Sequence, residues 1–247
     1  MRISLRRTRL FCGLRPLHLA VTPSGQVYWG EYFDNPHREE VHIYGSDDDG
    51  QTWHVAHTFP AGTVRHVHNV VYDRWRDCVW ILTGDEGDEC RIIRASQDLK
   101  RLHTVVQGTQ QWRAVAIVPT SEAVFFASDT PNEANHIYRI DDDGSIHCLA
   151  PISSSAISGC RVGQTVFFST MAEPGTVNCT THADLYASFD GEEWKCLVRW
   201  QKDIWPMRLF QYGAVFLASD NNDTPFLAAS SVAVKPDLAL NLWRVQE

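Results

Sequence analysis

Residues 46–53 constrain the fold more than any other stretch of the chain. They read Ser-Asp-Asp-Asp-Gly-Gln-Thr-Trp, which fits the turn pattern Ser-x-Asp-x-Gly-x-Thr-Trp. In this pattern the serine and aspartate hydrogen-bond backbone groups of the turn, the glycine adopts a left-handed conformation, and the tryptophan packs against the hairpin. The segment therefore predicts a tight hairpin between two β-strands.

Weaker copies of this turn recur along the chain. Residues 188–194 repeat it one residue shorter, and residues 96–98 and 141–144 occupy the corresponding turns of two further units. An apolar strand precedes each copy, at 41–45, 90–95, 136–140 and 184–187. Recurrence at a regular spacing indicates repeated supersecondary units that bury their apolar faces against one another.

A second set of apolar strands recurs at the same spacing along the sequence. Its five members are Val27–Glu31, Val79–Asp85, Val124–Asp129, Val166–Thr170 and Val215–Asp220. Propeller blades of four strands need roughly 40 to 50 residues each, so the chain has room for five. We therefore predict an all-β fold: a single five-bladed β-propeller with four-stranded antiparallel blades, forming one domain over residues 1–247.

The last repeat predicts how the ring closes. Residues 241–245 resemble the third strand of the other units, such as 136–140, and the chain then stops. The N-terminal residues 3–11 are predicted to supply the missing fourth strand, which would remove an exposed sheet edge. The apolar stretch 226–234 is interpreted as a long excursion between strands.

Charge and cysteine content limit the partners and the compartment. The formal net charge of −8 opposes binding to nucleic acid, which requires a concentrated basic face. The N-terminal arginines are followed by no apolar run long enough for a signal peptide or a membrane span, so we expect a cytoplasmic protein without membrane contact. Seven cysteines without a CxxC pair indicate small buried side chains in a reducing compartment. The residue pattern specifies no oligomeric state.

Polar residues recur where propeller strands meet the central face. Alignment of the repeats puts His18, His68, Arg113, a position near Ser158, and Arg208 at the innermost strands, and puts Glu31, Asp85, Asp129 and Asp220 at the ends of the second strands. Burying such groups is costly unless they pair or stay hydrated, so the pattern indicates a hydrated functional pocket. The alternative is a salt-bridged plug. Long loops after Glu31, Asp85 and Asp129 favour a ligand site.

The segment 65–69, Arg-His-Val-His-Asn, raises the question of a metal. Alternate residues of a strand point to the same side, so His66 and His68 could act together with His18 as three nitrogen ligands. One histidine could instead hydrogen-bond a loop. The default expectation is therefore no metal or other cofactor, with His18, His66 and His68 as the candidate ligands of a divalent ion.

With these turns and this strand cadence, the chain resembles the sialidase-like Asp-box (BNR repeat) β-propeller superfamily. The resemblance implies a propeller and a role in glycan hydrolysis or glycan binding. True sialidases have six blades, an early Arg-Ile-Pro motif, an arginine triad and a tyrosine–glutamate pair. Arg-Ile-Pro is absent here, so the resemblance predicts an atypical member with this fold and not a true sialidase.

The leading hypothesis for function is a glycoside hydrolase that acts on an acidic or polar glycan. Its predicted catalytic residues are Glu31, Asp85, Asp129 and His68, and its predicted substrate-binding residues are His18, Tyr32, His66, Arg113, Arg161, Arg208 and Asp220. A polysaccharide or oligouronide lyase that uses histidine and arginine is the second hypothesis. A non-catalytic module with Trp29, Tyr32, Phe33 and Trp112 as sugar platforms is the third.

Overall fold

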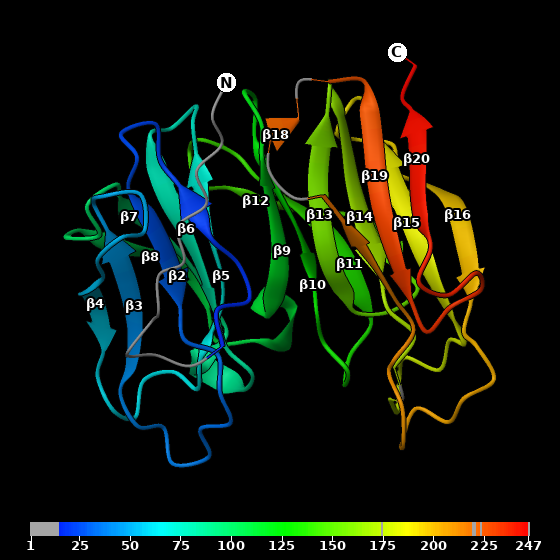
Figure 1. The fold of residues 1–247 in the computed structure, drawn as a ribbon, viewed down its shortest axis with the longest axis horizontal. Coiled ribbons are helices and arrows are strands. Elements are labelled where there is room, and N and C mark those ends of the chain that lie inside the picture. Colours follow the sequence, from blue (N-terminus) through cyan, green and yellow to red (C-terminus); the bar gives the residue numbers. More distant parts are fainter. Residues whose placement is uncertain (1–14, 174, 219–220, 223, 247) are drawn as a thin grey trace. The chain divides into compact units, whose positions relative to one another are not determined.

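The computed structural model describes residues 15–173, 175–218, 221–222 and 224–246. The chain divides into two compact units, Met1–Gly108 and Thr109–Glu247, and each unit is built from antiparallel sheets (Figure 1). Only two single-turn 3₁₀ helices, Gly87–Glu89 and Gln110–Trp112, interrupt the strands of the described residues. The prediction of an all-β fold is confirmed.

The first unit contains two four-stranded antiparallel sheets, each in sequential order. The first sheet consists of β1 (Ala20–Val21), β2 (Val27–Gly30), β3 (Val41–Ser46) and β4 (His54–Phe59). The second consists of β5 (Val67–Asp73), β6 (Cys78–Thr83), β7 (Arg91–Ser96) and β8 (Leu102–Gln107).

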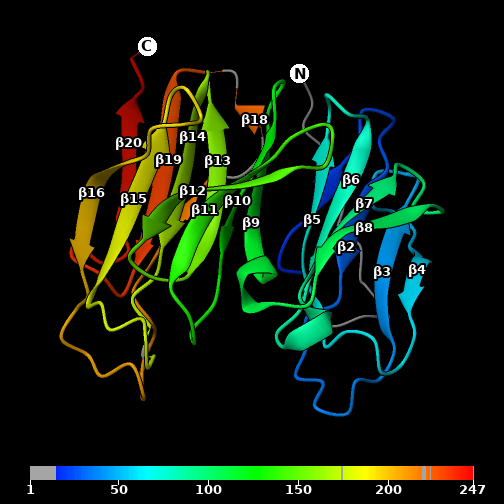
Figure 2. The same cartoon turned by 180° about the vertical axis from the view of Figure 1, so that it is seen from behind.

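The second unit contains three sheets, which Figure 2 shows from behind. The third sheet consists of β9 (Ala114–Pro119), β10 (Val124–Ser128), β11 (Asn135–Ile140) and β12 (Ile146–Ile152). The fourth consists of β13 (Ala156–Val162), β14 (Thr165–Thr170), β15 (His182–Ser188) and β16 (Lys195–Gln201), with the short β18 (Asn221–Asn222) parallel to β13. The fifth consists of β17 (Ala214–Leu217), β19 (Phe226–Val232) and β20 (Leu240–Arg244).

The predicted turn at 46–53 connects β3 to β4 with the expected contacts. The Ser46 hydroxyl donates to Asp48 Oδ1 at 2.8 Å and accepts the Gly50 N–H at 2.8 Å. Asp48 Oδ1 also accepts the Thr52 N–H at 2.8 Å. Gly50 has a φ of 80°, and the Trp53 ring lies 6.3 Å from the Trp29 ring. The turn is therefore held by side-chain acceptors, as its sequence predicts.

The weaker copies occupy the same place in their sheets. Ser188 and Asp190 hydrogen-bond at 3.0 Å between β15 and β16, and Ser96 and Asp98 at 2.6 Å between β7 and β8. Between β11 and β12, Asp143 accepts the backbone N–H of Ser145 at 2.8 Å. The repeat therefore marks the hairpin between the third and fourth strands in four successive sheets.

The C-terminal sheet differs from the prediction. Residues 226–234, interpreted as an excursion, contain β19, which pairs with β17 in the position of a third strand. Residues 241–245, predicted to be a third strand, instead lie within or next to β20, which pairs with the outer side of β19. The predicted closing strand at 3–11 lies outside the described residues.

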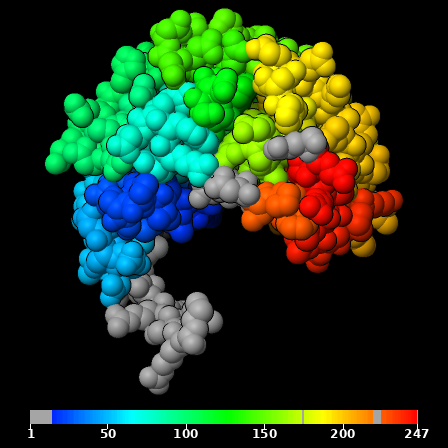
Figure 3. All heavy atoms as spheres, turned by 90° about the horizontal axis from the view of Figure 1, so that it is seen from above, coloured from blue at the N-terminus to red at the C-terminus, as the bar shows by residue number. Residues whose placement is uncertain are grey.

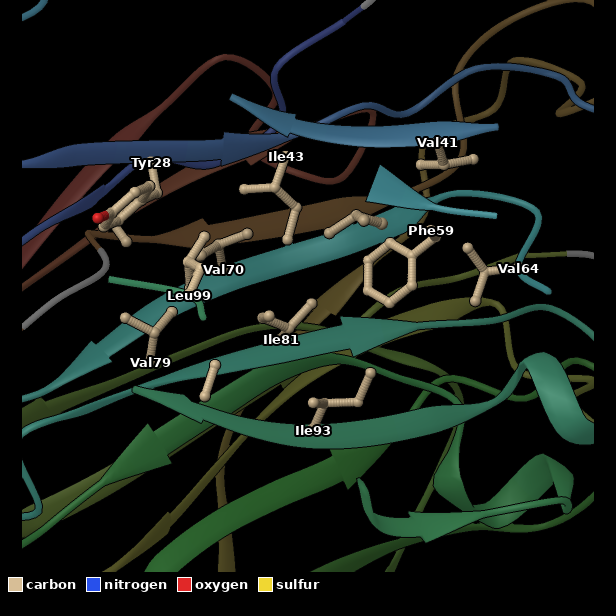
Figure 4. Close-up of a cluster of buried hydrophobic side chains, with 13 residues drawn as sticks. Tyr28, Val41, Ile43, Phe59, Val64, Val70, Val79, Ile81, Ile93 and Leu99 are labelled. Carbon is tan, nitrogen blue, oxygen red and sulfur yellow. The ribbon is translucent and has the colours of Figure 1, made fainter. Parts of the chain in front are cut away.

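Apolar side chains from facing sheets form the cores. In the first unit, Tyr28, Ile43 and Phe59 of the first sheet pack with Val70 and Ile81 of the second (Figure 4). Full burial of an isoleucine or phenylalanine stabilises a fold by about 1.5–3 kcal/mol. In the second unit, Trp200 of β16 meets Trp243 of β20 at 6.1 Å between ring centroids. Figure 3 shows the red C-terminal strand beside the yellow segment that contains β16.

The cysteines are free thiols throughout the described residues. Cys78, Cys90 and Cys160 are buried, as predicted, and burial raises the pKa of the Cys160 thiol to about 12. Cys148, Cys179 and Cys196 are exposed, which the sequence interpretation did not predict. Among the described residues, no helix is long and apolar enough to cross a membrane.

Candidate functional site

The start of β5 carries the histidines of the candidate site. The β5–β6 register passes from the pair Val67 and Thr83 to the pair Asn69 and Leu82, so His68 is the extra residue of a β-bulge. Bulges bend a strand and re-aim its side chains, and they are frequent next to active sites. His66 directly precedes β5, and its imidazole meets that of His68 at the start of the strand.

Asp85 follows β6 and completes a cluster with these two histidines. His66 Nε2 and His68 Nε2 lie 3.0 Å apart. Asp85 Oδ1 lies 3.3 Å from His68 Nε2 and 3.4 Å from His66 Nε2. The side chains of His66 and His68 are 5% and 2% exposed, whereas that of Asp85 is 14% exposed. We call His66, His68 and Asp85 the His–His–Asp cluster.

The loop between β2 and β3 covers the cluster and fixes one imidazole. The Tyr32 ring lies over His66, with 4.1 Å between ring centroids. His66 Nδ1 lies 3.1 Å from the Phe33 carbonyl, which can only accept, so this nitrogen carries a proton. Asn35 secures the loop, because its amide donates to the carbonyls of Glu39 and Arg65.

Arg65 places a cation at the outer side of the cluster. Its Nη1 lies 3.3 Å from Asp85 Oδ2, and its Nη2 donates to Asp34 Oδ1 at 2.6 Å. The hydrogen bond that Arg65 donates to Asp34 is the main cause that raises the pKa of Arg65. The Arg65 side chain remains 28% exposed. The guanidinium is therefore a fixed positive charge that a ligand can reach.

His18 and Glu31 lie in the same unit but play different parts. Burial lowers the pKa of His18, and the positive charge of His68 lowers it further, so the two imidazoles are near enough to interact electrostatically. However, the three residues whose ligand atoms lie within 4.8 Å of one another are His66, His68 and Asp85. Asp85 therefore takes the place that the sequence analysis predicted for His18. The buried carboxylate of Glu31 accepts the His42 backbone N–H at 2.9 Å, which is a structural contact.

The remaining predicted residues belong to the second unit. Arg113 and Asp129 face each other at 3.5 Å beside the start of β9. Arg161 is buried on β13 and donates to the Gly163 carbonyl. Arg208 is exposed in a turn that precedes β17. Asp220 lies outside the described residues. The structure thus brings Arg113 and Asp129 together.

The structure also corrects one predicted sugar platform. Trp29 is fully buried and stacks on Tyr44 at 4.7 Å, so its ring belongs to the core. Sequence reasoning did not assign roles to Arg65 or to the Phe33 carbonyl. The signal for Arg65 was its position directly before the His-x-His segment, at the start of a bulged strand. No signal in the sequence indicates the carbonyl, since every residue of the loop offers one.

Comparisons with known proteins show the fold. No protein-family model matches the sequence, and no curated protein matches it. Among solved structures, TolB from Acinetobacter baumannii is 14% identical with a TM-score of 0.53, over 92% of this chain and 54% of TolB. A structure from a study of two prolyl endopeptidases is 13% identical with a TM-score of 0.53, over 92% of this chain and 34% of that one. The GH74 enzyme from Niastella koreensis is 14% identical with a TM-score of 0.52, over 72% of this chain and 28% of the enzyme.

These similar structures are β-propeller proteins, and the likeness supports a propeller fold for this chain. The chain spans about half or less of the length of each of them. Identities of 13–14% carry no information about activity. Only the geometry of the site therefore bears on the function.

Proposed function

We propose that the chain is a carbohydrate-active enzyme that cleaves a glycan at the His–His–Asp cluster. The observation that carries the proposal is the contact of Asp85 with two buried imidazoles, at 3.3 and 3.4 Å, beside an accessible arginine. Carboxylates and imidazoles are the groups that transfer protons in glycan cleavage. Tyr32 offers a ring for a sugar face, and Arg65 offers a charge for an acidic substituent.

Hydrolysis is the reaction that this arrangement supports best. Asp85 and Arg65 are the more exposed groups, so a substrate meets them before it meets the imidazoles. Asp85 Oδ2 lies 3.3 Å from Arg65 Nη1, and a carboxylate beside a guanidinium suits the role of a base or a nucleophile. A protonated imidazole behind it would serve as the proton donor. One oxygen of Glu31 accepts the His42 backbone N–H, whereas Asp85 contacts both imidazoles, so Asp85 is the better-placed carboxylate.

Elimination is the second candidate, and the pairing of His68 with Arg65 around Asp85 favours it. In a lyase the base removes the proton next to a uronate carboxylate, and a cation neutralises that carboxylate. Here an imidazole would accept the proton and Arg65 would bind the carboxylate. The products differ from those of hydrolysis, because elimination leaves a double bond that absorbs ultraviolet light.

A panel of neutral, sialylated and uronic-acid glycans tests the proposal with two readouts. New reducing ends without ultraviolet absorbance indicate hydrolysis, whereas both signals together indicate elimination. Asp85→Asn should lower turnover by at least about 10²-fold, the usual contribution of a positioned acid or base. Asp47→Asn, at the exposed turn after β3, is the matched control and should retain full activity.

Two results would reject the proposal. Full activity of Asp85→Asn would show that the reaction occurs elsewhere on the chain. Glycan binding without any product after prolonged incubation would make the protein a binding module instead.

We further propose that the sheets are blades of one five-bladed ring over residues 1–247, closed by residues 3–11. Four described sheets contain the four strands of a blade. The fifth contains three, and because β20 already takes the outer position predicted for residues 3–11, the strand to be supplied is the one beside β17. Deletion of residues 1–14 should then lower the melting temperature, and an unchanged melting temperature would argue against this closure.

A further inference from the structure

We propose that His66, His68 and Asp85 bind a divalent transition-metal ion. The two imidazoles come from the bulged start of β5, and the carboxylate follows β6. One potential ligand atom from each residue lies within 4.8 Å of the other two. The proposal goes beyond glycan cleavage, because metal binding can hold whether or not the chain acts on a glycan.

The distances between the ligand atoms fit a metal ion. Tetrahedral zinc has bonds of about 2.0–2.1 Å to nitrogen and oxygen, which places neighbouring ligand atoms about 3.3 Å apart. The three separations in the cluster are 3.0 Å between the Nε2 atoms, and 3.3 and 3.4 Å from these atoms to Asp85 Oδ1. All three lie within about 0.3 Å of the tetrahedral value.

The protonation of His66 supports the same conclusion. Its Nδ1 donates to the Phe33 carbonyl, so in the neutral ring Nε2 carries a lone pair. That lone pair lies 3.0 Å from His68 Nε2 and 3.4 Å from Asp85 Oδ1, so a shared proton or a metal ion is needed to hold the three atoms together. Metal-bound histidines commonly donate their other nitrogen to a backbone carbonyl in this way.

The charged residues around the cluster are compatible with a bound metal ion. Arg65 lies 3.3 Å from Asp85 Oδ2, whereas Oδ1 is the oxygen next to both imidazoles. The negative charges of three carboxylates, those of Asp34, Asp85 and Glu86, stabilise the charged form of Arg65. Carboxylates therefore outnumber guanidinium groups around Arg65. Two imidazoles and one carboxylate favour zinc, iron, nickel or copper over calcium or magnesium, which prefer oxygen. Three protein ligands leave a coordination position for substrate.

Such an ion would supply Lewis acidity at the proposed reaction centre. It would also occupy the lone pairs of both imidazoles, so the proton-donor and proton-acceptor roles proposed for these rings apply to the metal-free protein. If both proposals hold, the metal-loaded protein and the chelator-treated protein should cleave glycans at different rates. Metal binding can be measured whether or not the protein has this activity.

Titration of the chelator-treated full chain with Zn²⁺ and Co²⁺ tests the proposal. Calorimetry should show one tight Zn²⁺ site per chain, and Co²⁺ should produce visible absorption bands without the near-ultraviolet band of thiolate ligands. Separate His68→Ala and Asp85→Asn variants should weaken Zn²⁺ binding by at least about tenfold, and Arg65→Gln should weaken it by about tenfold as an outer-shell change. His103→Ala, at an exposed position on β8, is the matched control.

Circular dichroism and melting in chelator confirm that each variant is folded before its binding is compared. If His68→Ala does not fold, Asp85→Asn and the Co²⁺ spectrum of the unaltered chain still decide the question. The proposal is overturned if Zn²⁺ binding is absent, if Asp85→Asn binds as tightly as the unaltered chain, or if the Co²⁺ spectrum shows thiolate ligands. If Zn²⁺ binding is absent, the three side chains are held together by a shared proton and not by a metal ion.

Discussion

Asn35 shows how one buried side chain can hold the loop that covers the cluster. It is 2% exposed, its amide donates to the carbonyls of Glu39 and Arg65, and its oxygen accepts the Glu39 N–H at 2.8 Å. Asn35→Ala leaves these backbone groups without their partner, so we expect a loss of about 1–3 kcal/mol in the free energy of unfolding. Urea denaturation measures this change.

The same substitution should loosen the loop that carries Tyr32 and the Phe33 carbonyl. Faster amide hydrogen exchange over residues 31–40 is therefore expected. Asn132→Ala is the control, because Asn132 is an exposed asparagine in a loop of the second unit. Unchanged stability and exchange in Asn35→Ala would show that the loop is held by its other contacts.

The residues of the cluster were partly predictable. Alternation along a strand places His66 and His68 on one side, and strand polarity in a propeller brings the end of β6 to the start of β5, which predicts the approach of Asp85 to His68. The ligand group that includes Asp85 and not His18 depends on interatomic distances around the bulge at His68. The residue pattern does not encode those distances.

At the scale of elements, Gly30 allows the first two sheets of the first unit to approach closely. A Cβ atom at Gly30 would lie 2.4 Å from Val67 Cβ, and the Val67 N–H donates to the Glu31 carbonyl at 2.9 Å. Gly30→Ala must push β2 away from β5, and overpacking of this kind costs about 1–3 kcal/mol. Because Val67 separates His66 from His68, the displacement should also weaken Zn²⁺ binding by the cluster.

Thermal melting and Zn²⁺ titration of Gly30→Ala measure the two effects. Gly62→Ala is the matched substitution, since a Cβ atom there meets nothing within 4 Å and only its φ of 83° adds a cost of about 1 kcal/mol. Zn²⁺ binding should be normal in Gly62→Ala. Equal stability of Gly30→Ala and the unaltered chain would show that the sheets can separate without cost.

Hairpin strands were predictable where turn chemistry marked them, and other strands were not. The copies of the turn at 46–53 located β3–β4, β7–β8, β11–β12 and β15–β16, because serine and aspartate side chains determine the turn locally. In the fifth sheet no such turn marks the connection between β19 and β20. Apolar character alone could not distinguish a third strand from an excursion, and only the pairing with β17 decides it.

At the scale of the whole molecule, the repeated turns make stability depend on pH. Asp48, Asp98, Asp143 and Asp190 each accept hydrogen bonds in their turn, and their pKa values are lowered. The main causes are the Thr52 N–H for Asp48, the Ser96 hydroxyl for Asp98, the Ser145 hydroxyl for Asp143 and the Glu193 N–H for Asp190. For Asp98 the pKa falls to about 2. Four hairpins in two units therefore share one response to acid.

The sign of the effect follows from linkage. A carboxyl whose pKa is lower in the folded state stabilises the fold above its unfolded pKa of about 3.9, and this contribution disappears as the pH falls through the folded value. We therefore expect the free energy of unfolding to decrease between about pH 5 and pH 2. An Asp48→Asn and Asp143→Asn double variant should be less stable than the unaltered chain at about pH 6, and the difference should vanish near pH 2.

Urea denaturation across this pH range measures both curves. The control is the double variant Asp49→Asn and Asp142→Asn, which removes two charges from the same two turns without removing the carboxylates that accept their backbone N–H groups. Its curve should run parallel to that of the unaltered chain. If both double variants flatten the pH dependence equally, the effect comes from the net charge of −8, and the turn hydrogen bonds do not cause it.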